Sequence, residues 1–261
     1  MLLTRTLRPL IVGAVTVLLG AACTDGDGAA VTSGSEPSGT LRVLAAASLT
    51  ETFTALEVEL EAQYQDLDVA ISFGPSSGLV EQVLAGAQAD VLATADSTTM
   101  DDAVASGVVA GEPVIFAQNT LALVVPAGNP GNVTGLADLA RDELRIALCE
   151  PQVPCGAAAA QLLDLAGVDA APDTLEGSVK GVSGKVALGE VDAALVYRTD
   201  AADEPGAIET LSVPEADQVV NDYPAAVLSD SLNPTAAHAF VAALTAPTGR
   251  QLLAEAGFGT P

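Results

Sequence analysis

Short apolar runs and helical stripes of apolar residues alternate along most of the chain. The first run covers residues 41–46, and Phe53, Leu56 and Leu60 then recur at helical spacing opposite a glutamate-rich face. Between the two, the sequence from Ser48 to Glu51 has the spacing of a capping box. The pattern therefore predicts a strand, a tight turn and a helix, whose first N–H groups form a potential anion site.

The same succession of strand, turn and helix recurs downstream. Further apolar runs predict strands, and further stripes predict helices, one of them capped by Ser97. The predicted strands are residues 67–73, 90–95, 120–126, 145–148, 193–197, 208–213 and 223–228, and the predicted helices are 79–85, 97–106, 136–144, 156–165, 179–188, 234–244 and 248–256. Strands that alternate with helices indicate an α/β fold with mostly parallel sheets.

Two of the apolar runs are interpreted as crossings between two lobes. Residues 120–126 lead out of the first lobe and residues 223–228 lead back into it. The predicted division is lobe 1 at residues 41–120 and 224–261, and lobe 2 at residues 121–223. Two extended crossover strands indicate a hinge between the lobes.

The N-terminal segment predicts an extracytoplasmic protein. Arg5 and Arg8 precede a ten-residue apolar run that is too short to span a bilayer, so residues 1–22 are interpreted as a signal peptide. Small residues before Cys23 resemble a bacterial lipoprotein cleavage site, and we expect Cys23 to carry a lipid that anchors the protein to the cell membrane. Residues 23–40 have almost no apolar side chains to bury and suit a flexible tether.

Composition excludes some classes of ligand. Nine basic residues against 34 acidic ones argue against nucleic acid as a partner, and we interpret the acidity as a solubilising surface. The chain has three Tyr, five Phe and no Trp, which disfavours ligands that bind by stacking on aromatic rings, such as sugars.

Cys149 and Cys155 lie six residues apart in a protein expected outside the cytoplasm, and this predicts a disulfide. A zinc site at this pair would need more thiol or imidazole ligands nearby. The only histidine, His238, lies far away in a C-terminal helix and is interpreted as a surface residue.

Several motifs closely resemble the molybdate-binding proteins of ABC transporters, the ModA family within the type II periplasmic binding proteins. The resemblance covers residues 41–258 and rests on AAASLT at 45–50, AGAQADVLATAD at 85–96, VPCG at 153–156, LVYRTDA at 195–201 and YPAAV at 223–227. It implies a two-lobed fold and a monomer that captures molybdate or tungstate between the lobes and delivers it to a membrane permease. It implies no enzymatic activity and no cofactor.

The resemblance also implies which residues bind the oxyanion. Molybdenum would bind only as its oxyanion, which would accept hydrogen bonds from hydroxyl groups, backbone N–H groups or both. The implied ligands are Ser48 and Ser76 through both hydroxyl and backbone N–H, Tyr197 through its hydroxyl, and Cys155 and Val179 through their backbone amides. Lys180 and Arg198 flank these positions and are expected to stay outside the pocket.

Two alternatives remain open from the sequence. A binding protein for sulfate or another small anion would share the whole architecture. An extracytoplasmic hydrolase with Ser48 or Ser76 as nucleophile is a less favoured alternative, because the chain has no GxSxG or SxxK motif and its single histidine lies far from both serines.

Overall fold

The computed structural model describes residues 36–261, which form one compact unit. The predicted signal peptide, Cys23 and most of the predicted tether lie outside the described residues. Among the described residues, no helix has the length and apolar character needed to cross a membrane.

Nine strands form a continuous sheet in the order β2-β1-β3-β9-β4-β7-β5-β6, with β8 paired to β4 beside this path. Strands β1, β2 and β3 are parallel to one another, as are β5, β6 and β7, whereas β4 and β9 run antiparallel to their neighbours. The strands are β1 (Gly39–Ala46), β2 (Leu67–Gly74), β3 (Val91–Ala93), β4 (Val109–Pro126), β5 (Ile146–Cys149), β6 (Thr174–Glu176), β7 (Ala193–Tyr197), β8 (Ile208–Leu211) and β9 (Val220–Leu228).

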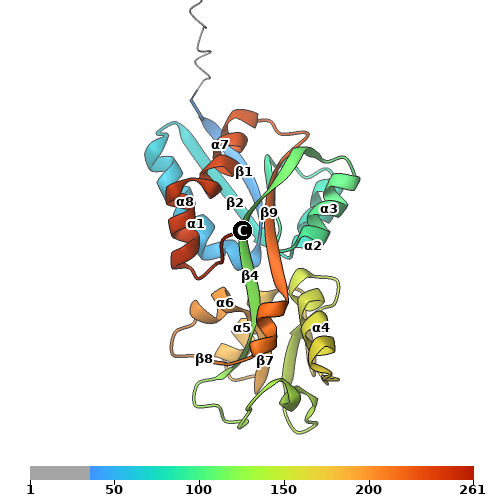
Figure 1. The fold of residues 1–261 in the computed structure, drawn as a ribbon. Coiled ribbons are helices and arrows are strands. Elements are labelled where there is room, and N and C mark those ends of the chain that lie inside the picture. Colours follow the sequence, from blue (N-terminus) through green and yellow to red (C-terminus); the bar gives the residue numbers. More distant parts are fainter. Residues whose placement is uncertain (1–35) are drawn as a thin grey trace, which may run out of the picture. The chain divides into compact units, whose positions relative to one another are not determined.

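Helices cover both groups of parallel strands (Figure 1). The α-helices are α1 (Thr50–Gln63), α2 (Ser76–Leu84), α3 (Ser97–Ala105), α4 (Pro154–Ala166), α5 (Val179–Ala187), α6 (Arg198–Ala202), α7 (Pro234–Thr245) and α8 (Pro247–Glu255). Three short 3-10 helices are η1 (Ala47–Leu49), η2 (Leu136–Ala140) and η3 (Pro214–Gln218). The mixed α/β fold with parallel strands and flanking helices confirms the predicted fold class.

Two long strands connect the two groups of elements, as Figure 1 shows. Strand β4 pairs with β9 from Val109 to Thr120, and with β7 and β8 from Leu121 to Pro126. We call the group with β1, β2, β3, α1, α2, α3, α7 and α8 lobe 1, and the group with β5 to β8 and α4 to α6 lobe 2. The residue boundaries that the sequence predicts for the lobes stay a prediction.

Aromatic rings fill the core where lobe 1 meets the connecting strands. Phe53 of α1 packs against Phe116 of β4, and Phe116 packs edge-on against Tyr223 of β9. Tyr223 in turn contacts Tyr197 at the end of β7, with ring centroids 5.9 Å apart, and Phe258 near the C-terminus. Edge-to-face packing of this kind holds the rings in defined positions, and so fixes the place of the two tyrosine hydroxyls.

Some elements differ from the sequence-based prediction. Strand β4 begins at Val109 rather than near residue 120, because two irregularities in its pairing with β9 hide the alternation of its first half. The helix expected at 136–144 is the short 3-10 helix η2. Strand β6 and helix α6 were not predicted, since three and five residues are too few to establish a periodic pattern.

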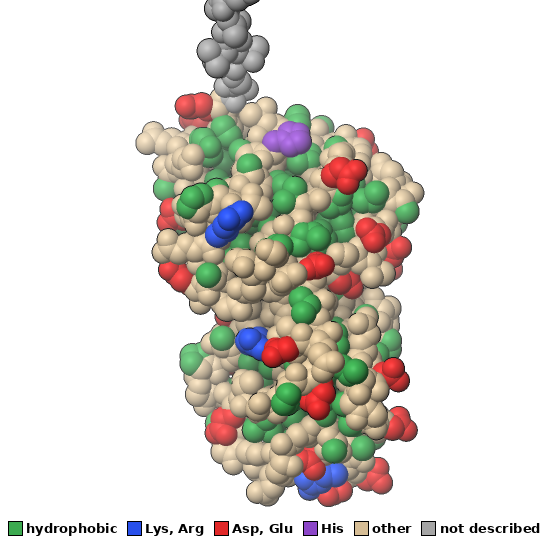
Figure 2. Space-filling model, in the orientation of Figure 1, with side chains coloured by type: hydrophobic (Ala, Val, Ile, Leu, Met, Phe, Trp, Pro, Cys, Tyr) green, Lys and Arg blue, Asp and Glu red, His purple; other side chains and the backbone are tan. Residues whose placement is uncertain are grey.

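Acidic side chains are scattered over the face of the molecule that Figure 2 shows, rather than gathered in one patch. Their spread agrees with the interpretation of the acidity as a solvated surface.

Candidate functional site

One cavity brings together all five residues that the sequence analysis proposed as oxyanion ligands. The cavity lies between the lobes. The centre of a water-sized sphere can occupy about 20 Å³ inside it. This space suits one small ion and is too little for a sugar or a peptide. No lining residue carries a charge. The cavity is lined by Ala46, Ala47, Ser48, Gly74, Pro75, Ser76, Ala95, Val153, Pro154, Cys155, Ser178, Val179 and Tyr197.

Three helices begin at this cavity. Ser76 is the first residue of α2, Cys155 is the second residue of α4, and Val179 is the first residue of α5. The first N–H groups of a helix have no partner inside the helix, and the helix dipole adds partial positive charge there. The cavity therefore concentrates N–H donors and positive potential from both lobes without using a charged side chain.

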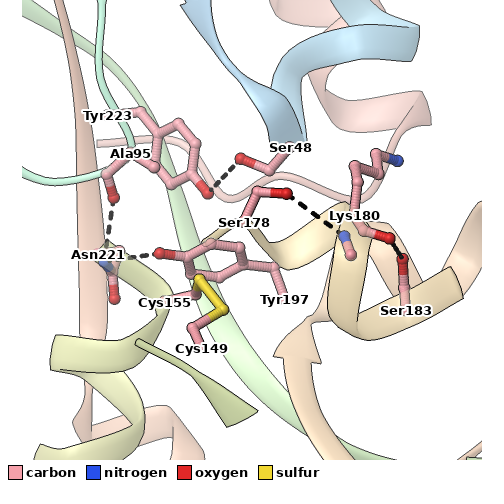
Figure 3. Close-up of a disulfide and its surroundings, with 11 residues drawn as sticks. Ser48, Ala95, Cys149, Cys155, Ser178, Lys180, Ser183, Tyr197, Asn221 and Tyr223 are labelled. Carbon is pink, nitrogen blue, oxygen red and sulfur yellow. Dashed lines mark hydrogen bonds between the residues drawn. A yellow bond between two sulfur atoms is a disulfide. The ribbon is translucent and has the colours of Figure 1, made fainter. Parts of the chain in front are cut away.

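Ser48 does not cap helix α1, contrary to the capping-box prediction. It lies in η1, the residue at the N-cap of α1 is Leu49, and no side chain caps that helix. The Ser48 hydroxyl instead lies 3.0 Å from the Tyr223 hydroxyl, and either oxygen can donate (Figure 3). The 3-10 turn shifts the start of the helix and turns the serine toward the cavity.

The other two hydroxyls accept hydrogen bonds from other groups of the protein. The Ala95 N–H donates to Ser76 Oγ at 3.0 Å. The Asn221 side-chain amide donates to the Tyr197 hydroxyl at 3.1 Å and to the Ala95 carbonyl at 3.0 Å, as Figure 3 shows. Each hydroxyl keeps its own hydrogen for a further partner.

Both tyrosine hydroxyls stay protonated. Burial raises the pKa of Tyr197 well above its usual value, and the nearby Tyr223, Asp96 and Asp200 raise it further. Burial also raises the pKa of Tyr223, although its hydrogen bond with Ser48 acts in the opposite direction. Near neutral pH the two groups are therefore hydrogen-bond donors and not anions.

A disulfide holds the turn that presents the Cys155 amide. Cys149 ends β5 and Cys155 lies in the first turn of α4, and their sulfurs are bonded to each other (Figure 3). Gly156 follows directly, and a Cβ at that position would collide with the carbonyl group of Glu150. This explains why the VPCG turn has a glycine and no larger residue there.

The two basic residues beside the cavity bind acidic side chains, as the sequence analysis expected of residues outside the pocket. Lys180 Nζ lies 2.9 Å from Glu51 Oε2, 2.8 Å from Asp203 Oδ2 and 3.2 Å from Asp200 Oδ1. Arg198 pairs with Asp217 at the surface. Neither basic residue lines the cavity.

A larger groove of about 790 Å³ adjoins the cavity and shares Val153 and Pro154 with it. Its walls include four carboxylates, from Glu81, Asp96, Asp102 and Asp222. These charges repel anions, so the groove is a poor site for an oxyanion. Among the described residues, no group of three or more His, Cys, Asp or Glu side chains is arranged to hold a metal ion.

Sequence reasoning missed Ala95, which lines the cavity, and Asn221 and Tyr223, which lie behind it. The segment from 223 to 227 contributed to the resemblance, but Tyr223 was interpreted only as part of a crossing strand. Asn221 lies before the predicted strand of residues 223–228, and only the structure shows that it is buried on the same face of β9 as Tyr223 and needs a partner.

Comparison with known proteins agrees with this geometry. The family model described as "Bacterial extracellular solute-binding protein" matches residues 41–259. The protein named molybdate-binding protein ModA from Mycobacterium tuberculosis (strain ATCC 25618 / H37Rv) is 41% identical over 219 residues, which are 84% of each chain.

Solved structures share the fold. A periplasmic molybdate-binding protein from Azotobacter vinelandii superimposes with a TM-score of 0.72 at 24% identity, over 85% of this chain and 99% of the other. The sulfate-binding protein SubI from Mycobacterium tuberculosis H37Rv superimposes with a TM-score of 0.73 at 22% identity, over 84% of this chain and 86% of the other. At these identities the similarity concerns the fold alone. By the family match and the 41% identical relative, the chain belongs to the bacterial extracellular solute-binding proteins, in the group that contains the ModA proteins.

Proposed function

We propose that this protein captures molybdate, and also tungstate, in the cavity between its lobes and delivers it to the permease of an ABC transporter. The observation that carries the proposal is a small cavity lined by hydroxyl and N–H groups from both lobes and by no charged side chain. The proposed ligands are the hydroxyls of Ser48, Ser76 and Tyr197 and the amides of Cys155 and Val179.

A tetrahedral dianion suits such a site. Each hydrogen bond to a charged group contributes about 1.5 to 3 kcal/mol before the costs of desolvation and closure, so several of them give tight binding without a counter-charge. A phosphate that keeps a proton would need an acceptor, and the three hydroxyls are proposed to act as donors. Discrimination would then depend on protonation and size rather than on net charge.

The relatives support molybdate in particular. The M. tuberculosis protein that is 41% identical is named as a molybdate-binding protein. Sulfate is the second candidate for the same cavity, and it is expected to be too small to contact the donors of both lobes at once.

The proposal makes the chain a carrier and not an enzyme. The hydroxyls of Ser48 and Ser76 contact Tyr223 and Ala95, and His238 is exposed on α7. A serine hydrolase needs a base beside its nucleophile. Turnover of an ester substrate that His238→Ala abolishes would favour the hydrolase instead.

The proposed setting is the outer side of the cell membrane. We infer that residues 1–22 are removed, that Cys23 carries the lipid anchor and that the protein acts as a monomer without a cofactor. Partition of the protein into detergent, lost in Cys23→Ser, would support the anchor, and a mature N-terminus mapped elsewhere would contradict it.

Isothermal titration calorimetry tests the proposed ligand. Molybdate and tungstate should bind, and sulfate and phosphate should bind more weakly. Because the ligand contacts both lobes, a thousandfold excess over Kd should stabilise the fold by about 4 kcal/mol, which raises the melting temperature by several degrees. No heat with molybdate or tungstate, or equal affinity for sulfate, would overturn the assignment.

A further inference from the structure

Asn221 connects the two lobes behind the cavity. It lies on β9 with 7% of its surface exposed, and its side-chain nitrogen contacts the Ala95 carbonyl on the lobe 1 side and the Tyr197 hydroxyl on the lobe 2 side. The same Ala95 donates its N–H to Ser76 Oγ. Asn221 thus contacts one proposed ligand residue directly and reaches a second through a single residue.

The direction of these hydrogen bonds follows from chemistry. A backbone carbonyl can only accept, so the side-chain atom that faces Ala95 O must be the NH2 group of Asn221 and not its oxygen. The second hydrogen of that NH2 group then points at Tyr197, whose oxygen must accept it. The hydrogen of the Tyr197 hydroxyl is consequently left for another acceptor, which is either the neighbouring Tyr223 hydroxyl or a ligand in the cavity.

Ser76 is oriented in the same way. A backbone N–H can only donate, so the Ser76 oxygen accepts from Ala95 and the hydroxyl hydrogen of Ser76 is also left for another acceptor. Ser76 and Tyr197 both line the cavity, one from each lobe. In two of the three hydroxyls the oxygen therefore already accepts a hydrogen bond, and the hydrogen remains available to donate one.

We infer that Asn221 is a positioning residue that sets the Tyr197 hydroxyl as a donor toward the ligand and thereby favours fully deprotonated oxyanions over protonated ones. The inference rests on the proposed function and deepens it. An aspartate at this position would reverse the bond, because a carboxylate accepts the Tyr197 hydrogen and leaves the tyrosine oxygen facing the cavity as an acceptor. A protonated oxyanion such as hydrogen phosphate would then find an acceptor at Tyr197, which the unchanged site does not offer at that position.

The main test is a double-mutant cycle with molybdate as the probe. Asn221→Ala should weaken molybdate binding about tenfold in the unchanged background, because Tyr197 loses the group that orients it. In a Tyr197→Phe background the same substitution should change the affinity by less than about twofold, since the hydroxyl on which Asn221 acts is gone. An equal loss in both backgrounds would show that Asn221 acts on general packing and would overturn the inference.

A second readout uses selectivity and pH. In Asn221→Asp, the ratio of molybdate to phosphate affinity should fall at least about tenfold, whereas the added negative charge alone would weaken both anions alike and leave the ratio unchanged. Molybdate binding by this variant should recover only in part as the pH is lowered from about 8 to about 6, because protonation of the buried carboxyl removes its charge, but its single hydrogen goes to the Ala95 carbonyl and none is left for Tyr197. Asn221→Ala should show no such recovery.

The outcomes separate this inference from the proposed function. If the unchanged protein binds no oxyanion, both are overturned. If it binds molybdate but the ratio and the cycle show no dependence on Asn221, only the inference is overturned. Circular dichroism and the melting temperature of each ligand-free variant verify folding, and the cycle with Asn221→Ala decides the question if Asn221→Asp does not fold.

Discussion

Lys180 Nζ, at the start of helix α5 in lobe 2, lies 2.9 Å from Glu51 Oε2, in the first turn of helix α1 in lobe 1. The ion pair therefore joins the lobes one residue away from Val179, whose amide is a proposed ligand. Burial raises the pKa of Glu51, but its hydrogen bond with Lys180 and further hydrogen bonds bring the pKa below the usual value. Burial alone would lower the pKa of Lys180. Its three acidic partners outweigh burial and hold the pKa above the usual value.

Glu51→Gln should loosen the contact between the lobes. The ion pair is partly exposed, so its loss should weaken ligand binding by only about 0.2 to 1 kcal/mol, mainly through faster dissociation. Stopped-flow measurement of oxyanion release tests this. Glu59→Gln is the matched control, because Glu59 is exposed on the same helix and does not contact Lys180. Equal release rates for the two variants would contradict a role of Glu51 in closure.

Asp200 should make stability depend on pH. Its side chain is fully buried, and although Lys180 lies nearby, neither carboxylate oxygen has a hydrogen-bond partner in the described part of the chain. Burial, together with the negative charges of Asp203 and Glu51, raises the pKa of Asp200 to about 7 against the opposing charge of Lys180. The folded state therefore binds this proton more tightly than the unfolded state does.

The sign of the effect follows from that shift. The contribution of Asp200 to stability is complete below its unfolded pKa of about 4 and is lost as the pH rises to about 7. Asp200→Asn should remove this dependence of stability on pH. The unchanged protein should lose a few kcal/mol of unfolding free energy through Asp200 between about pH 4 and pH 8, and the variant should not, so the variant should gain stability relative to the unchanged protein by that amount. Urea unfolding at several pH values measures this difference. A difference that is constant with pH would show that Asp200 does not titrate in this range.

The proposed ligands could be named from the sequence because most of them lie in local turns. Ser76, Cys155 and Val179 each open a helix directly after a short extended segment, and such turns are recognisable from a few consecutive residues. Tyr197 was placed correctly at the end of an apolar strand. The resemblance to a known family supplied the roles, which the turns alone do not reveal.

The groups behind the ligands were not predictable in the same way. The hydrogen bond between Ser48 and Tyr223 joins residues 175 positions apart, and the one between Asn221 and Ala95 joins residues 126 positions apart. No local pattern specifies such pairs, because they arise only when β9 returns to lobe 1. The capping-box prediction at Ser48 was wrong for the same reason, since a distant tyrosine binds the hydroxyl that the local spacing assigned to the helix.

Loss of the disulfide between Cys149 and Cys155 should affect both stability and binding. The double variant Cys149→Ser with Cys155→Ser should lose about 2 kcal/mol of unfolding free energy, as the chain-entropy model gives for a short loop. It should also bind the oxyanion more weakly, because the turn that presents the residue 155 amide is less constrained. Urea unfolding and calorimetry measure the two effects. If alkylation labels both cysteines of the unreduced protein readily, the disulfide is absent in solution.

Ser76→Ala and Ser48→Ala should each weaken molybdate binding by about 1.5 to 3 kcal/mol, because each removes one hydroxyl donor to a charged ligand. The ligand-free proteins should stay folded. Ser48 caps no helix, so its replacement removes no cap, and it leaves the buried Tyr223 hydroxyl without this partner, which lowers the melting temperature slightly. Calorimetry and thermal unfolding measure binding and stability separately.

Ser97→Ala is the matched control for Ser76→Ala. Ser97 is the first residue of α3 as Ser76 is the first residue of α2, but Ser97 faces the acidic groove and does not line the small cavity. The control should therefore bind molybdate as the unchanged protein does. If the two alanine variants lose affinity equally, the loss reflects a general effect on helix starts, and Ser76 would not be a ligand. If only Ser76→Ala loses affinity while both keep their melting temperatures, the hydroxyl of Ser76 binds the oxyanion directly.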